Sequence, residues 1–159
     1  MSDTPDGDGA ARRVAVVTGG ATGIGRAVCQ ALAAKGMRVG VVYNSSEAKA
    51  RAVAEGLDGA FVARADLADP AQVEALVKHL QEVAGRVDVL VNNAGYNRDA
   101  PIFSMKIDDY DAVAGLARGT WYLTKLVLRR FILRSGWRVI NISSVVGHTG
   151  NPSQVPYTM

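Results

Sequence analysis

Short apolar runs alternate with longer helical stretches along this sequence, and this alternation constrains the fold more than any other feature. Each run is nearly continuous in apolar residues, many of them β-branched, which is typical of strands buried on both faces. Each stretch between two runs shows apolar residues at helical spacing. The runs lie at 13–18, 37–43, 60–65, 87–92 and 137–143, and the helical stretches at 23–35, 46–57, 69–85 and roughly 108–134. Five strands with helices between them predict an α/β fold, a Rossmann-like doubly wound parallel sheet.

Two of the predicted helices carry boundary signals. Asp69 followed by Pro70 is the combination of an N-cap with a proline at the first helical position. Gly36 comes directly after the first helical stretch and is expected to end it. The apolar side chains that share one face of that stretch predict its contact with the sheet; they are Ile24, Val28, Ala31 and Leu32.

The N-terminal residues differ in composition from the rest of the chain. Residues 1–12 are rich in acidic and small residues and contain Pro and Gly, which predicts a disordered tail before a single domain at 13–159. They contain no apolar segment of the kind that a signal peptide has, and no stretch approaches the ~18 apolar residues of a membrane span. A soluble, cytoplasmic protein is therefore expected. The single cysteine, Cys29, fits that compartment, and its apolar neighbours predict buried packing.

Charge and histidine spacing argue against two further classes of protein. The formal net charge is +3, and no nucleic-acid-binding motif accompanies it, so no nucleic-acid partner is expected. The two histidines, His79 and His148, are not at metal-ligand spacing, so no metal site is expected. We expect His148 to be a loop residue, with a place in a substrate pocket as the alternative.

A glycine-rich turn, TGGATGIG at 18–25, lies between the first predicted strand and the first predicted helix. Gly19 allows a tight turn, and Gly23 and Gly25 let the backbone approach a pyrophosphate. The helix N-terminus adds its dipole and free N–H groups. The turn therefore predicts dinucleotide binding, with candidate cofactor-binding residues Gly19, Thr22, Gly23, Ile24 and Gly25.

Polar residues follow the second and third predicted strands, where a doubly wound sheet binds its ligands. Asn44, Ser45 and Ser46 stand where NAD enzymes usually place a carboxylate, and the absence of that carboxylate favours NADP. The alternative for the two serines is capping of the next helix. Asp66 and Leu67 are candidates for contact with the adenine ring, with a plain turn as the alternative for Asp66.

Three motifs occur in order and resemble the short-chain dehydrogenase/reductase family over about residues 13–159. They are the glycine-rich turn, NNAG at 92–95 after Asp88, and INISSVVG at 140–147. The resemblance implies further cofactor contacts at Asn93, Ala94 and Gly95. It also implies a catalytic serine at Ser144 and a catalytic tyrosine thirteen residues later, at Tyr157.

Within this family, NNAGYNRDAPIFSM is similar to 3-oxoacyl-[acyl-carrier-protein] reductases and acetoacetyl-CoA reductases, through Arg98 and Asp99. The resemblance implies NADPH-dependent reduction of a 3-oxoacyl thioester in fatty acid biosynthesis. Tyr157 would be the acid and Ser144 the orienting hydroxyl. It also implies a homo-oligomer, usually a tetramer. A short-chain dehydrogenase that acts on another alcohol or ketone is the alternative.

The sequence departs from the family pattern at two catalytic positions. The family lysine four residues after the tyrosine would be residue 161, beyond Met159. An Asn-Leu-x-Gly segment is replaced by Leu116, Ala117 and Arg118 before Gly119. We therefore expect a C-terminally truncated family member with five of the usual seven strands, its last strand uncovered, and negligible turnover as a 159-residue chain. A nucleotide-binding or heteromerising pseudoenzyme is the alternative.

Basic residues concentrate in KLVLRRFILRSGWR, near the end of the last predicted helix. They predict an amphipathic interface helix with a solvated basic face. The alternative, which the family resemblance suggests, is a dock for an acidic acyl-carrier protein by charge complementarity at Arg129 and Arg130.

Overall fold

A computed structural model describes residues 12–131 and 136–158 and contains one parallel sheet of five strands. The strand order is β3-β2-β1-β4-β5, which confirms the predicted doubly wound α/β class. The strands are β1 (Val14–Thr18), β2 (Arg38–Tyr43), β3 (Phe61–Arg64), β4 (Val89–Asn92) and β5 (Arg138–Asn141). The helices are α1 (Gly23–Ala34), α2 (Glu47–Glu55), α3 (Pro70–Ala84), α4 (Ile107–Phe131), α5 (Val146–Thr149) and the 3-10 turn η1 (Val155–Tyr157).

Two of the predicted segments extend past the described residues. Residues 1–11 of the predicted tail lie outside them, while Arg12 donates hydrogen bonds to Gly36 O at 2.8 Å and to Asp58 Oδ2 at 2.6 Å. Residues 132–134 of the predicted long helix also lie outside. Among the described residues, no helix is long and apolar enough to cross a membrane.

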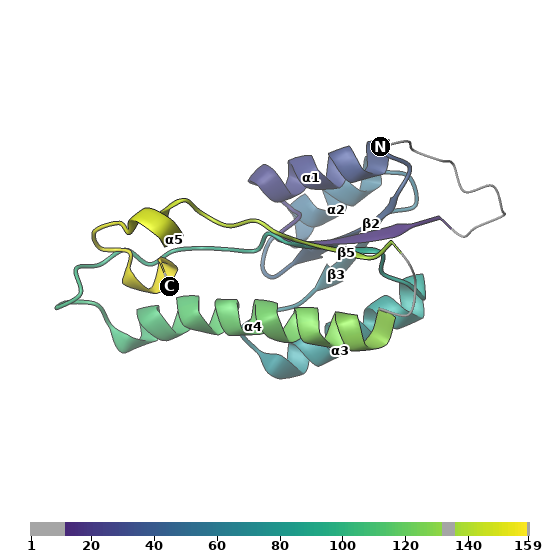
Figure 1. Ribbon diagram of the computed structural model, residues 1–159. Helices are drawn as coiled ribbons and strands as arrows, with labels where there is room; N and C mark the ends of the chain where they lie inside the picture. The colour runs from purple at the N-terminus through teal and green to yellow at the C-terminus, as the bar shows by residue number, and fades with distance from the viewer. Residues whose placement is uncertain (1–11, 132–135, 159) are drawn as a thin grey trace.

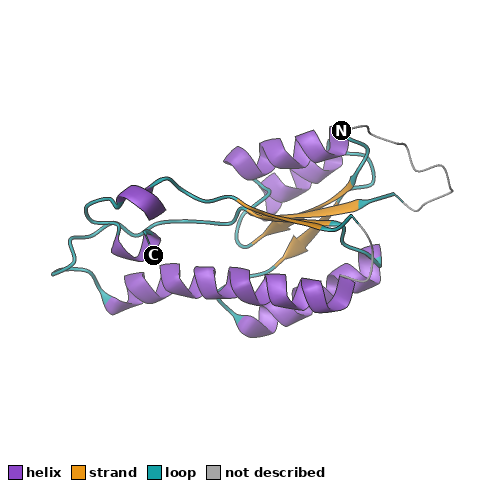
Figure 2. Cartoon of the chain, in the orientation of Figure 1, coloured by secondary structure: helices purple, strands orange, loops and turns teal. Residues whose placement is uncertain are grey.

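The helices form one layer on each face of the sheet (Figures 1 and 2): α1 and α2 cover one face, and α3 and α4 the other. Successive residues of β1 belong alternately to the two cores. Val14 and Val16 belong to the core that contains α3 and α4 residues. Ala15 and Val17 belong to the core that contains α1 and α2 residues. Both faces of β1 are thus buried, which is why its sequence is continuously apolar.

The fifth strand lies at the edge of the sheet and is much less buried than the others. Ile140 of β5 is 43% exposed, and Ile142, just after the strand, is 40% exposed. In the described part of the chain, β5 pairs with β4 only. The expectation of an uncovered last strand agrees with this exposure.

The buried face of α1 agrees with the predicted one at Val28 and Leu32, which pack against the core, and differs from it at the other two positions. Its two fully buried residues are Gly25 and Cys29, whereas Ile24 is 63% exposed and Ala31 is also exposed. The buried face lies about one residue further along because Gly25 lets the helix approach the turn before it. A Cβ on Gly25 would lie 2.2 Å from Gly19 O.

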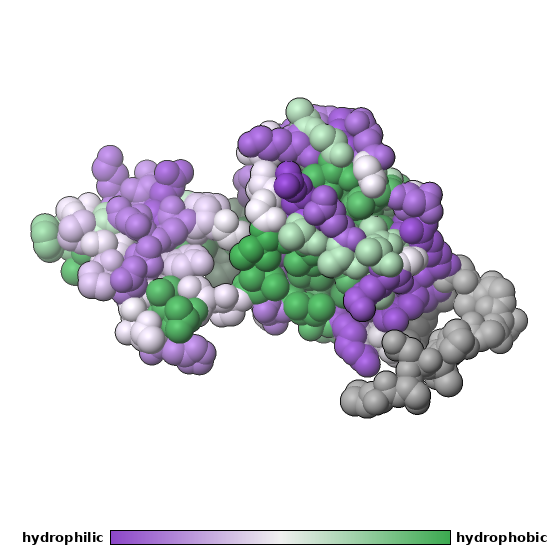
Figure 3. All heavy atoms as spheres, turned by 90° about the horizontal axis from the view of Figure 1, so that it is seen from above, coloured by the Kyte–Doolittle hydropathy of each residue, from purple (hydrophilic) through white to green (hydrophobic). Residues whose placement is uncertain are grey.

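The other element boundaries agree with the sequence to within two or three residues. Asp69 caps α3 as predicted, accepting a hydrogen bond from Ala71 N at 2.9 Å. Two short elements were not predicted: α5, which contains the exposed His148, and η1. With the loop after β4 they form a small lobe beside the sheet, and Figure 3 shows hydrophilic side chains over much of its upper face.

Asp88, just before β4, joins the amino-terminal ends of β1, β4 and β5. Its carboxylate accepts hydrogen bonds from Val14 N at 2.8 Å and from Arg86 Nε at 2.7 Å and Nη2 at 2.5 Å. Its backbone N–H donates to Val14 O, and its carbonyl accepts from Arg138 N. The side chain is only 5% exposed, so this ion pair is largely shielded from water.

We predict that Asp88→Ala lowers the free energy of unfolding by about 3–5 kcal/mol, because it removes the buried carboxylate that accepts hydrogen bonds from Arg86 and Val14 N. Urea unfolding measures the change. The matched control is Glu47→Ala, which breaks the exposed pair between Glu47 and Arg51 and should cost less than about 1 kcal/mol. Equal effects of the two substitutions would contradict the role assigned to Asp88.

The same interaction predicts a dependence of stability on pH. Burial alone would raise the pKa of Asp88, but the hydrogen bonds from Arg86 and Val14 outweigh it and hold this pKa below its ordinary value. The contribution is therefore complete above the unfolded pKa of ~3.9 and is lost as the pH falls through the folded value. The stability difference between the wild type and Asp88→Asn should be constant above about pH 5 and should shrink as the pH falls from there through the folded pKa.

Candidate functional site

The glycine-rich turn after β1 is hydrogen-bonded to the NNAG segment after β4. The buried Thr18 hydroxyl accepts hydrogen bonds from Asn93 N and Ala94 N, both at 3.0 Å. In return, Asn93 Nδ2 donates to Thr18 O at 2.9 Å and to Gly19 O at 3.2 Å. Two motifs that are more than seventy residues apart in sequence therefore form one rigid corner at the carboxyl end of the sheet.

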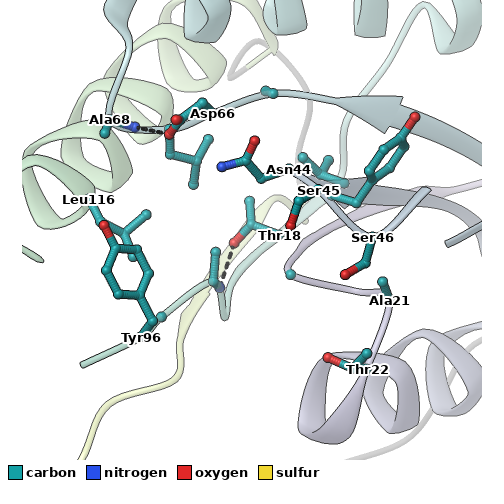
Figure 4. A pocket seen from close by; sticks show the side chains of 17 residues that line it. Thr18, Ala21, Thr22, Asn44, Ser45, Ser46, Asp66, Ala68, Tyr96 and Leu116 are labelled. Carbon is teal, nitrogen blue, oxygen red and sulfur yellow. Dashed lines mark hydrogen bonds between the residues drawn. The ribbon is translucent and has the colours of Figure 1, made fainter. Parts of the chain in front are cut away.

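A cavity of about 250 Å³ opens at this corner; we call it the strand-end cavity. Nine of the thirteen predicted cofactor-binding residues line it: Gly19, Thr22, Asn44, Ser45, Ser46, Asp66, Leu67, Ala94 and Gly95. In Figure 4, Asn44 lies between Asp66 and Thr18, while Tyr96 and Leu116 lie on the side opposite Thr22. The polar residues after three different strands thus meet at one place, as the topology of a doubly wound sheet requires.

The other four predicted cofactor-binding residues do not line this cavity. Gly23 faces a neighbouring cavity between α1 and α2, and Ile24 and Asn93 line a third cavity. Gly25 is buried beneath the turn, where a Cβ would also lie 2.5 Å from Asn93 Nδ2. Its role in the described structure is therefore to let α1 pack against the turn.

Hydrogen bonds in the strand-end cavity test the alternative roles of its polar residues, a plain turn for Asp66 and helix capping for the serines. Asp66 Oδ1 accepts from Ala68 N at 2.9 Å, which is the turn interaction expected of an aspartate after a strand. Ser46 is the N-cap residue of α2, yet its side chain forms no capping hydrogen bond in the described part of the chain. Capping does not account for the Ser46 hydroxyl.

The cavity between α1 and α2 is basic, and we call it the Arg26 cavity. It is lined by Thr22, Gly23, Arg26, Gln30 and Lys49, among others, and shares Ala21 and Thr22 with the strand-end cavity. Neither Arg26 nor Lys49 forms a salt bridge with another described residue. An anionic group at the common wall would therefore lie near two cationic side chains.

Ser144 and Tyr157 line the third cavity, which measures about 640 Å³; we call it the Ser144–Tyr157 cavity. Ser144 follows β5 and is half-buried, with its Oγ accepting from Val146 N at 3.4 Å. Tyr157 is the last residue of η1 and is 38% exposed. No hydrogen bond joins the two side chains among the described residues. His148 is not among the lining residues.

The strand-end cavity and the Ser144–Tyr157 cavity share a wall made of Ala94, Gly95, Tyr96 and Leu116. A ligand that extends from one cavity to the other would pass this wall. Tyr96 was not predicted from the sequence as a lining residue. Its position directly after NNAG could have indicated this role. Its hydroxyl donates to Ala112 O at 2.9 Å.

Leu116 reaches the shared wall because α4 crosses the chain closely at Gly119. A Cβ on Gly119 would lie 1.7 Å from Leu67 O, so only glycine permits this crossing. Leu116 precedes Gly119 by three residues, the position of the asparagine in the family's Asn-Leu-x-Gly segment. The position thus borders both cavities and carries an apolar side chain.

Other chemically reactive groups lie away from these cavities. Burial raises the pKa of the Cys29 thiol to about 11, which disfavours the reactive thiolate. No cluster of described residues has the composition of a metal site. Arg129 and Arg130 lie near the C-terminal end of α4, where they line a groove with Glu74, Val77, Lys78 and Leu126.

The sequence profile described as short chain dehydrogenase matches residues 13–159, and the chain belongs to this family. It is 40% identical over 151 residues to a 3-oxoacyl-[acyl-carrier-protein] reductase of Synechocystis sp., with 92% of this chain and 61% of the relative covered. It is 36% identical over 148 residues to the Escherichia coli reductase of the same name, with 91% and 60% covered. The chain thus spans about three fifths of the length of these relatives.

Solved structures agree with the fold. A short chain dehydrogenase from Burkholderia cenocepacia in complex with NADP is 32% identical, with a TM-score of 0.85 over 92% of this chain and 61% of that one. A 3-oxoacyl-[acyl-carrier protein] reductase from Brucella melitensis is also 32% identical, with a TM-score of 0.81 over 92% and 63%. The family resemblance drawn from the sequence motifs is confirmed.

We predict that Gly119→Ala lowers the free energy of unfolding by about 3 kcal/mol, because α4 must move away from Leu67. Gly115→Ala, one turn earlier, is the matched control. There a Cβ would meet only Ala68 Cβ, at an ordinary 3.5 Å, so alanine should be neutral or stabilising by up to ~1 kcal/mol. Urea unfolding of both variants tests this, and similar losses at both positions would show that the close crossing is not responsible.

Proposed function

We propose that the chain carries the nucleotide site and the catalytic tyrosine and serine of an NADPH-dependent reductase of 3-oxoacyl thioesters. The observation that carries the proposal is the shared wall between two cavities. One cavity collects the polar residues expected to hold a dinucleotide, and the other contains Ser144 and Tyr157. The similarity to 3-oxoacyl-[acyl-carrier-protein] reductases supports the choice of substrate.

The residues around the strand-end cavity fit a dinucleotide. Thr22, the N-cap residue of α1, forms no side-chain capping bond among the described residues, so the helix N-terminus remains available to a pyrophosphate. Gly23 adopts a φ of +52° and a Cβ there would meet nothing within 4 Å, which leaves an open surface beside that helix end. Asp66 retains Oδ2 for the adenine amino group, since the hydrogen bond from Ala68 N uses Oδ1.

Two features favour NADPH over NADH. Asn44, Ser45 and Ser46 present neutral donors after β2, and Asp66 is the one acidic residue among the described residues that line the cavity. Arg26 and Lys49 lie in the neighbouring Arg26 cavity, where they would attract a 2′-phosphate. Similar structures in complex with NADP and with NADPH support the same choice.

The side chains of the Ser144–Tyr157 cavity match the needs of carbonyl reduction. A carbonyl oxygen gains negative charge as it is reduced, so it requires a proton donor and a second hydrogen-bond donor. We assign proton donation to the Tyr157 hydroxyl and orientation of the carbonyl to the Ser144 hydroxyl. NADPH supplies the hydride when bound.

A second candidate function is nucleotide binding without turnover, and Leu116 is the observation that favours it. The family resemblance assigns that position to an asparagine that supports a proton-relay water. An apolar side chain at the shared wall cannot hold such a water by hydrogen bonding. Binding of NADPH and reduction of substrate must therefore be measured separately.

The first test measures the affinity of the chain for NADPH and for NADH, using the fluorescence of the reduced nicotinamide. We expect the wild type to bind NADPH more tightly than NADH. Arg26→Ala/Lys49→Ala should weaken NADPH binding by about tenfold, the loss of one charge-assisted hydrogen bond, and leave NADH binding unchanged. Lys35→Ala, at the other end of α1, is the control and should change neither. Equal affinity of the wild type for both nucleotides would exclude the NADPH assignment.

The second test is NADPH oxidation with an acetoacetyl thioester. If the reductase function holds, Tyr157→Phe lowers the rate at least about 100-fold, the usual contribution of a positioned general acid, while NADPH affinity is retained. Leu116→Asn should raise the rate by restoring a polar group at the shared wall. Wild type that binds NADPH without measurable oxidation would instead support the second candidate function.

The same assay tests the partner. We propose that an acidic acyl-carrier protein docks at Arg129 and Arg130, which are exposed at the end of α4. Arg129→Glu/Arg130→Glu should raise the KM for the thioester carried on carrier protein and leave that for the coenzyme A thioester unchanged. Equal KM changes for both thioesters would exclude this dock.

A further inference from the structure

Two loops at the rim of the Ser144–Tyr157 cavity are held together by a side chain that the proposed mechanism does not use. Both carboxylate oxygens of Asp99 accept hydrogen bonds from Gln154 Nε2, at 3.2 and 3.3 Å. The residue after Asp99 and the residue before Gln154 are also joined, since Ala100 N donates to Ser153 O at 2.9 Å. The loop after β4 and the loop after α5 are therefore joined by both side-chain and backbone hydrogen bonds.

Gln154 connects this junction to the tyrosine. Its carbonyl oxygen accepts hydrogen bonds from Tyr157 N at 3.0 Å and from Thr158 N at 3.1 Å, which form the turn of η1. Pro156 within this turn is buried. Asp99 thus holds the side chain of Gln154, while the backbone carbonyl of Gln154 holds Tyr157.

The backbone next to Gln154 shows why such a constraint is needed. Ser153 has a φ of +67° and is the only non-glycine residue with a positive φ in the described part of the chain. This conformation is unfavourable for a residue with a Cβ and persists where neighbouring contacts hold it. The hydrogen bond from Ala100 N to Ser153 O is such a contact.

Asp99 is itself held in place. Its Oδ1 accepts a hydrogen bond from Asn97 Nδ2, and Asn97 lines the Ser144–Tyr157 cavity. Arg98 Nε lies 3.7 Å from Asp109 Oδ1 of α4, and the Arg98 guanidinium lies over the Tyr96 ring. The loop that carries Asp99 is therefore attached to the same helix that forms the cavity wall.

We propose that Asp99 is a positioning residue that sets the place of Tyr157 in the Ser144–Tyr157 cavity by holding Gln154. Asp99 does not line that cavity, so its effect passes through Gln154 and the η1 turn. The catalytic meaning of this arrangement rests on the proposed function, because it assigns proton donation to Tyr157.

The experiment follows Tyr157 directly and does not require turnover. 3-Fluorotyrosine is placed at position 157 of the full chain, and its ¹⁹F resonance is recorded together with amide hydrogen exchange. We expect Asp99→Ala and Gln154→Leu to shift the resonance equally toward its position in the urea-unfolded chain. Exchange of the Tyr157 and Thr158 amides should become about tenfold faster, while β1 amides remain protected. The double variant should match either single variant.

Two further variants separate positioning from a general loss of structure. Asp99→Asn keeps an oxygen acceptor for Gln154 and should retain most of the wild-type ¹⁹F shift. Asp111→Ala removes an exposed carboxylate near the same end of α4 and should leave the resonance unchanged. An unchanged resonance in Asp99→Ala, or equal effects of Asp99→Ala and Asp99→Asn, would overturn the proposal.

A titration of the wild type with NADPH completes the design by testing the proposed function independently. Absence of NADPH binding together with the expected ¹⁹F changes would reject the reductase function and leave the Asp99–Gln154–Tyr157 connection intact. Normal NADPH binding without those ¹⁹F changes would reject the connection and leave the function standing.

Discussion

The exchange of hydrogen bonds between Thr18 and Asn93 is the interaction on which the rest of the site depends. Thr18 Oγ accepts two backbone N–H groups of the NNAG segment, and the Asn93 amide returns two bonds to the carbonyls of the glycine-rich turn. Both partners lie at the carboxyl ends of adjacent parallel strands, β1 and β4. Buried polar groups are costly unless they are paired, so this reciprocal arrangement fixes the turn and the NNAG segment together. Both the strand-end cavity and the Ser144–Tyr157 cavity open from that corner.

Glycines then determine how closely the helices approach this corner. Gly25 lets α1 lie against Gly19, and Gly119 lets α4 cross at Leu67. The second crossing has a functional consequence, because it brings Leu116 to the wall between the two cavities. One helix contact thus decides which side chain lies between the proposed nucleotide site and the proposed catalytic pair. In this chain that side chain is apolar, so NADPH binding does not by itself imply turnover.

The loops that carry the catalytic candidates depend on a different set of bonds. Ser144 follows an edge strand whose apolar residues are partly exposed, and Tyr157 lies in a single 3-10 turn. Neither position is supported by a deep core. The hydrogen bonds of Asp99 and Ala100 to the loop before η1 supply an alternative support that is local and polar. Such bonds contribute less than core burial, so this lobe should open more easily than the sheet.

The sequence by itself determined the sheet and predicted most of the polar residues that line the strand-end cavity. Continuous apolar runs predicted strands buried on both faces. Residues that follow parallel strands meet at one edge of the sheet, so the sequence alone predicted that Asn44, Asp66 and Ala94 lie near one another. Only the tertiary structure decided that α1 is buried through Gly25 and Cys29, that Leu116 borders both cavities, and that Asp99 holds Gln154. The physical reason is that periodicity reports which face of an element is apolar. The distance between two elements depends on which atoms meet at their crossing, and that information is not local in the chain.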